Sequence, residues 1–194
     1  MKTGQALAGA IASGVLAALL ALPTGAADLF VAGPVESLNA STREAVVLGQ
    51  RVQLNAQQFA RIRAVVRHDS AFGYQPYIEI SGTDSRAGAI LAKSIQRASV
   101  PYVAGATPVA LRGFVSKAAD SRGRLTVGEL KVDATAATSN LNVGDLIELA
   151  GTQPNARGLA IATTLRVVQG IIGSGTDGII GSGTNGIIGS GTNG

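Results

Sequence analysis

The sequence predicts an all-β chain in which two tandem small closed barrels precede a glycine-rich repeat tail. Aromatic residues make up 4% and charged residues 14%, while aliphatic and β-branched residues are plentiful, a composition that favours strands. A pattern of short strands and turn glycines occurs twice between residues 33 and 165. Residues 170–194 repeat one octapeptide three times, which predicts a repeated structural unit or a self-associating tail.

Residues 1–27 read as a signal peptide. Lys2 precedes an apolar run from Ala6 to Leu22, Pro23 breaks that run, and small residues lead to a cleavage site after Ala27. The alternative is an uncleaved anchor, because about 17 apolar residues is the short limit for a spanning helix. Cleavage predicts an exported protein without a membrane span, located in the periplasm, on the cell surface or outside the cell.

The globular part divides into two similar halves. Gly33–Asn55 matches Gly113–Thr135, and Ile78–Ile95 matches Ile147–Leu165 with one residue of slack. Proline and glycine interrupt the pattern between the two copies. The predicted divisions are a first barrel, a linker and a second barrel at residues 28–98, 99–108 and 109–169.

Each half is expected to consist of about five short, bent strands, as in a small closed barrel. In each half a strand, Val46–Leu54 or Leu125–Val132, alternates around a central glycine, which indicates a bulge or a sharp bend. Alternation also predicts that Glu79 and Glu148 face water. We expect turns to open at Gly82 and Gly151 and strands to return over 89–95 and 159–165. No helical stripe longer than three turns stands out.

The second half resembles a bacterial exported domain family of unknown function with small OB-like barrels. The resemblance rests on turn glycines and core positions, namely Gly113, Val115, Val132, Asp133, Ala134, Thr135, Leu141, Val143, Gly144, Asp145, Gly151, Gly158, Ala162 and Thr163. The first half departs from it over residues 60–80, where the chain is longer and Pro76 replaces the Gly-Asp turn. The resemblance implies a tandem pair of OB-like barrels and says almost nothing about activity.

The longer stretch of the first half is the most functional-looking one. Read as a strand, it places Arg61, Arg63 and Arg67 on one face. Aromatic residues flank them, with Phe72, Tyr74 and Tyr77 as candidate ligand contacts and Phe59 on the other side. Arginine beside aromatic rings on an OB-type barrel would suit a polyanion or a polysaccharide. The alternative is a solvated strand face with aromatics over the barrel mouth.

Nothing in the sequence predicts a catalytic, cofactor or metal site. His68 is the sole histidine and cysteine is absent, so we expect His68 at the surface of a strand end rather than as a general base. Asp133 and Asp145 are expected to support turns rather than to form a carboxylate pair. The G-x-G-x-x-G matches in the tail, such as Gly173–Gly178, follow from the octad, because no helix is predicted after them.

The tail alternates six residues with a turn dipeptide, Asp177-Gly178 or its Asn-Gly equivalents. This pattern predicts a β-meander of strands and type I′ turns, with a thin solenoid as the close alternative and a flexible, disordered tail as the third. Paired isoleucines argue for self-association, which would use Ile171, Ile172, Ile179, Ile180, Ile187 and Ile188.

The function expected from the sequence is that of a non-enzymatic exported protein whose octads mediate self-association or attachment. Its expected partners are other copies of the chain, as a homo-oligomer or a filament, or a cell-surface component. The alternative is a polyanion or polysaccharide binding module that uses the arginine and aromatic residues of the first barrel.

Overall fold

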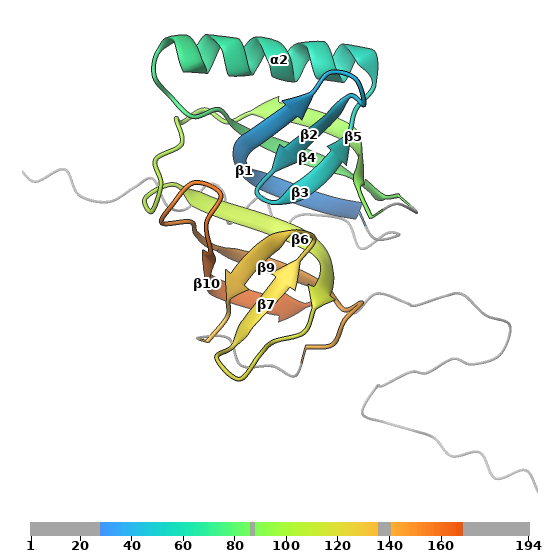
Figure 1. Ribbon diagram of the computed structural model, residues 1–194, viewed down its shortest axis with the longest axis vertical. Coiled ribbons are helices and arrows are strands. Elements are labelled where there is room, and N and C mark those ends of the chain that lie inside the picture. Colours follow the sequence, from blue (N-terminus) through green and yellow to red (C-terminus); the bar gives the residue numbers. More distant parts are fainter. Residues whose placement is uncertain (1–27, 86–87, 136–140, 169–194) are drawn as a thin grey trace, which may run out of the picture.

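The computed structural model describes residues 28–85, 88–135 and 141–168 (Figure 1). These ranges form two groups of five strands that lie one above the other. The first group comprises β1 (Asp28–Asn39), β2 (Glu44–Val47), β3 (Gln50–Gln53), β4 (Tyr77–Asp84) and β5 (Ile90–Arg97). The second comprises β6 (Pro108–Lys117), β7 (Arg124–Val127), β8 (Leu130–Asp133), β9 (Leu146–Thr152) and β10 (Ala160–Val167). The fold is therefore predominantly β, as predicted.

Each group of strands closes into a ring of pairings. In the first, β1 pairs with β2, β2 with β3, β3 in parallel with β5, β5 with β4, and β4 again with β1. The second repeats this order, from β6 through β7, β8, β10 and β9 back to β6. The duplication seen in the sequence is thus a duplication of topology.

The two rings join through β1 and β6, which makes one continuous ten-stranded sheet. Val31 pairs with Leu111, and the flanking pairs are Phe30 with Arg112 and Ala32 with Ala110. This register is symmetric about the Val31–Leu111 pair, so an approximate twofold axis relates the halves. Directly paired residues point to the same face of a sheet, and both Val31 and Leu111 are fully buried in one shared core.

The two glycine-centred segments are hairpins rather than single bent strands. A two-residue turn, Leu48-Gly49, separates β2 from β3, and Gly128-Glu129 separates β7 from β8. Leu48 has a φ of 47°, which is rare for a residue with a branched side chain. The two turns meet near the twofold axis, where the Glu129 amide donates to the Gly49 carbonyl at 2.9 Å.

Gly82 and Gly151 do not open turns, because they lie inside β4 and β9. The neighbouring strands are irregular in register at these points. A Cβ on either glycine would collide with a backbone carbonyl oxygen, that of Leu91 for Gly82 and that of Ile161 for Gly151. The two glycines are therefore required by close approach of the backbone.

The prediction of a strand across the arginine-rich stretch is wrong, because α2 (Ala56–Ala71) is a 16-residue helix. Asn55 caps its first turn by accepting from the Gln58 amide at 2.8 Å, and the Gln58 side chain accepts from the Asn55 amide at 2.8 Å. This reciprocal pair is a capping box. The helix lies over one end of the first ring (Figure 1), and Ile62 and Asp69 are its buried residues.

The segment between the halves, residues 98–107, packs closely against both of them. Tyr102 is 5% exposed, and its hydroxyl donates to the Gln153 carbonyl oxygen at 3.1 Å. Among the described residues, no helix is both long and apolar enough to cross a membrane. The predicted signal peptide and the octad tail, with its six isoleucines, lie outside the described residues.

Candidate functional site

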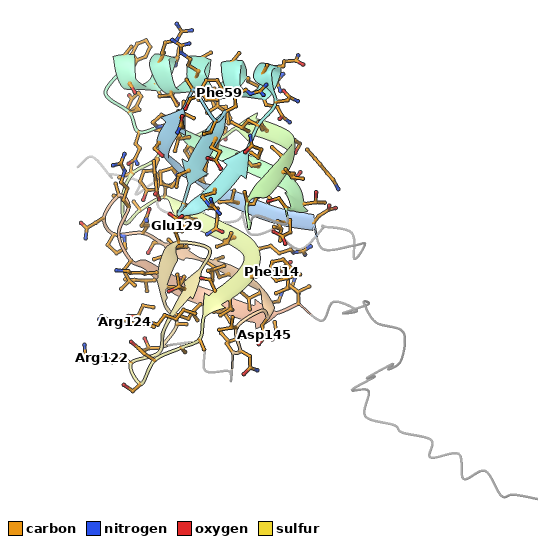
Figure 2. All side chains as sticks on the ribbon, turned by 45° about the vertical axis from the view of Figure 1, so that its right-hand side comes forward. Phe59, Phe114, Arg122, Arg124, Glu129 and Asp145 are labelled. Atoms are coloured by element: carbon orange, nitrogen blue, oxygen red, sulfur yellow. The ribbon has the colours of Figure 1, made fainter. Side chains whose placement is uncertain are left out.

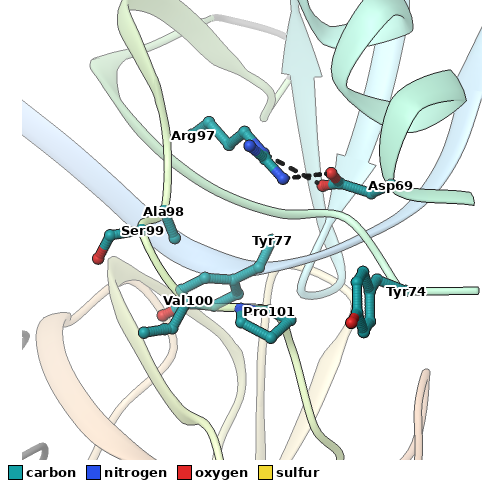
Figure 3. A pocket seen from close by; sticks show the side chains of 8 residues that line it. All are labelled: Asp69, Tyr74, Tyr77, Arg97, Ala98, Ser99, Val100 and Pro101. Carbon is teal, nitrogen blue, oxygen red and sulfur yellow. Dashed lines mark hydrogen bonds and ion pairs between the residues drawn. The ribbon is translucent and has the colours of Figure 1, made fainter. Parts of the chain in front are cut away.

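A small pocket of about 170 Å³ opens where α2 ends and the segment after β5 begins (Figure 3). Its lining combines a charged pair, two tyrosines and one stretch of backbone, namely Asp69, Tyr74, Tyr77, Arg97, Ala98, Ser99, Val100 and Pro101. The helix, β4 and β5 each contribute, so the fold of the first half builds the pocket.

The end of α2 positions two of these side chains. The amides of Phe72 and Tyr74 donate to the Asp69 carbonyl at 3.1 and 2.9 Å. Gly73, with a φ of 75°, adopts the left-handed conformation that commonly ends a helix. This turn sends the chain back toward β4 and leaves the Tyr74 ring about half exposed at the pocket wall.

Asp69 and Arg97 form the charged pair of the pocket. Arg97 Nη2 lies 2.5 Å from Asp69 Oδ1, and the Asp69 side chain is 6% exposed while that of Arg97 is 50% exposed. His68 Nδ1 lies 3.0 Å from the same Asp69 oxygen. Burial alone would raise the pKa of Asp69, but hydrogen bonds from His68 and Arg97 and their charges lower it below its usual value.

Tyr77 forms a fixed floor of the pocket. Its hydroxyl donates to the Pro108 carbonyl at 2.9 Å, and its ring stacks on Tyr102 with centroids 6.1 Å apart. Burial, with the negative charges of Glu79 and ionised Tyr102, raises the pKa of Tyr77 well above its usual value. Burial also raises the pKa of Tyr102, so Tyr77 and Tyr102 are neutral hydrogen-bond donors at physiological pH.

The structure brings together only part of the predicted binding set. Tyr74 and Tyr77 line the pocket, whereas Phe72 is 66% exposed and is not part of the lining. Phe59, labelled in Figure 2, packs against the core. Arg61, Arg63 and Arg67 are exposed on α2, where Arg63 and Arg67 share a side and Arg61 does not, because residues two apart on a helix diverge.

A second charged cluster crosses three strands of the other half. Glu148 on β9 pairs with Arg112 on β6 and with Arg166 on β10, each contributing an Nε atom 2.5 Å from a Glu148 oxygen. Glu148 lies on the face opposite the core, as alternation predicts, but it is 4% exposed. The prediction that it faces water is therefore wrong, while Glu79 is partly exposed.

The remaining candidates have structural roles. Asp133 accepts from the Thr135 amide at 3.1 Å and Asp145 from the Asn142 amide at 2.8 Å, so turn chemistry is confirmed for both. His68 lies on a helix rather than at a strand end, with its side chain 59% exposed. In the described part of the chain, no three metal-binding side chains cluster, and no serine hydroxyl bonds to His68.

The pocket must be interpreted from its own chemistry. The chain matches no known protein-family model, and no curated protein shows significant similarity to it. Asp69 and Arg97 were not singled out from the sequence. Asp69 stands seven residues after Ile62, a spacing that indicates the buried side of a helix once the helix is recognised.

Proposed function

We propose that the described residues form two OB-like barrels that act as a non-enzymatic binding module of an exported protein, with a saccharide as its ligand. The closure of five strands in the same order in both halves supports the barrel interpretation. The single observation that carries the function is the pocket beside Tyr74. There the exposed Tyr74 ring lies next to the Asp69 carboxylate and the Arg97 guanidinium, which are paired with each other.

The chemistry of this pocket favours a sugar over a polyanion. The positive charge of Arg97 is balanced by Asp69, so the pocket offers little net attraction to an anion. Free N–H groups of Arg97 and the Ser99 side chain can bond to hydroxyl groups, and the Tyr74 ring can stack on the apolar face of a sugar. A volume of about 170 Å³ is below the roughly 300 Å³ at which typical ligand pockets begin, which suits one ring of a longer chain.

Calorimetric titration with neutral hexasaccharides of glucose and N-acetylglucosamine tests this proposal. We expect Tyr74→Ala to weaken binding about fivefold or more, since loss of a stacking ring removes about 1 kcal/mol or more. Phe72→Ala is the matched control, because Phe72 is equally near the helix end but outside the pocket. Equal weakening by both variants, or no binding of any hexasaccharide, would contradict the proposal.

A salt series separates the sugar from the polyanion alternative. Binding of heparin that falls steeply with salt and is reduced in the Arg63→Ala/Arg67→Ala variant would identify the exposed arginines of α2 as the binding surface instead. Saccharide binding at the pocket should be nearly independent of salt, because no net charge is neutralised.

Self-association through the octads is the second candidate function. Every described strand already has at least two strand neighbours, so these strands offer little edge for pairing with another copy. Association by strand pairing would then depend on residues 170–194. Sedimentation velocity of the chain from Asp28, beside a version ending at Gln169, tests this: larger species that need the tail support it, and identical sedimentation contradicts it.

A further inference from the structure

The approximate twofold axis relates the points at which the chain leaves the two rings. Pro34 pairs with Tyr77 in the first half, and Phe114 pairs with Leu146 in the second. The chain then exits β5 with the Ala98 amide donating to the Tyr77 carbonyl at 3.1 Å. It exits β10 in the same way, with the Val168 amide donating to the Leu146 carbonyl at 2.8 Å.

In the first half, the four residues after Ala98 cover the strand pair they have just left. Pro101 lines the pocket beside Tyr77, and the Tyr102 ring stacks on the Tyr77 ring. As a result Tyr77 is only 2% exposed. The exit segment is thus part of the packing of the first half, not a free connection.

The equivalent surface of the second half is apolar and partly open. Phe114 is 36% exposed (Figure 2), and it shares a face with its direct partner Leu146, which is 8% exposed. Val143 is 65% exposed in the neighbouring turn, which is tied to β6 by the Gly144 amide donating to the Val115 carbonyl at 2.9 Å. Exposed apolar side chains such as these indicate a surface that another segment covers.

The sequence after Val168 supplies apolar residues at the matching distance. Four residues follow Ala98 to reach Tyr102, and four follow Val168 to reach Ile172, so Ile171 and Ile172 correspond in sequence spacing to Pro101 and Tyr102. We propose that the first octad docks within its own chain, with Ile171 and Ile172 packing on Phe114 beside Leu146. The second and third octads, identical in their isoleucines, have no corresponding surface supplied by the duplication.

This inference does not depend on the saccharide proposal or on self-association. Three nearly identical repeats would then have different roles. The first would complete the packing of the second half, and the later two would remain available for other contacts. The reason is geometric, because only the first isoleucine pair is within five residues of Val167, where β10 ends.

The identity of the repeats provides a matched test. In the full chain, Ile171→Asp/Ile172→Asp should lower Tm by about 4 °C or more, because an apolar contact to Phe114 is lost. Ile187→Asp/Ile188→Asp makes the same chemical change in the third octad and should leave Tm unchanged. Hydrogen exchange should accelerate at residues 113–115 and 146–147 in the first variant alone.

Two results would overturn the proposal. Equal Tm values and equal exchange in the two variants would show that the first octad has no special contact. A Tm difference that grows with protein concentration would show that the surface is covered by the tail of a second copy instead of the chain's own.

Discussion

The two halves have the same order of strands in their rings but differ in the segment that connects the third strand to the fourth. This difference shows where the protein could gain a site. Between β3 and β4 the first half inserts the 16-residue helix α2, whose Ile62 is fully buried. Between β8 and β9 the second half has residues 134–145, of which Leu141 is 7% exposed. The helix brings Asp69 and Tyr74 to the pocket, and the second half has no equivalent residues among those described. A duplicated scaffold has thus been specialised by one insertion.

The largest expected effect tests what the halves share. Gly82→Ala and Gly151→Ala should each destabilise the protein by about 3 kcal/mol or more, because the new Cβ collides with backbone rather than with a movable side chain. Gly88→Ala is the control. Gly88 has a φ of 68° and open space around it, so only about 1 kcal/mol of backbone strain is expected. Urea unfolding measures the free energy of unfolding of all three variants. A mild effect at either strand glycine would show that the backbone does not approach equally closely at the two positions.

The next effect tests how each ring is closed. Ile62→Ala should cost about 3 kcal/mol and Leu141→Ala about 2 kcal/mol, within the range for truncating a buried aliphatic side chain. The order follows from burial, since Ile62 is inaccessible and Leu141 is not fully so. If urea unfolding showed a larger loss of stability for Leu141→Ala than for Ile62→Ala, the loop would stabilise its ring more than the helix stabilises the other.

The smallest effect concerns the pH dependence of the stability of the first half. The lowered pKa of Asp69 means that its ionised form stabilises the fold above the usual pKa of about 3.9, and that this stability is lost as pH falls through the lower folded value. Asp69→Asn should therefore flatten the fall in unfolding free energy below about pH 4. A slope in Asp69→Asn equal to that of the unaltered chain would contradict the expectation.

The repeated features of the fold were predictable because they are local. Alternation identified the returning strands, and the doubled pattern identified two similar halves. The helix also had local signals in the sequence. Asn55 and Gln58 form a capping box, and the spacing of Phe59, Ile62, Val66 and Asp69 is that of one side of a helix. It was missed because the alternation of Arg61, Ile62 and Arg63 was read as a strand.

Contacts between distant residues were not predictable in the same way. Asp69 and Arg97 meet because the end of α2 lies beside the end of β5. Glu148 was correctly placed on the outer face but is buried, since Arg112 and Arg166 on the two adjacent strands close over it. Neither pairing leaves a pattern in the sequence, because each depends on which strands become neighbours.

The position of β1 has a consequence for the order of folding. This strand is the first described element, yet it pairs with β2, β4 and β6, and its pairing of Phe30 with Arg112 joins residues far apart in the sequence. Contacts of such long range form slowly. During synthesis from the N-terminus, residues 30–32 of β1 must remain without their β6 partner until the second half arrives, so we expect the first half made alone to expose this stretch and to aggregate more readily than the whole.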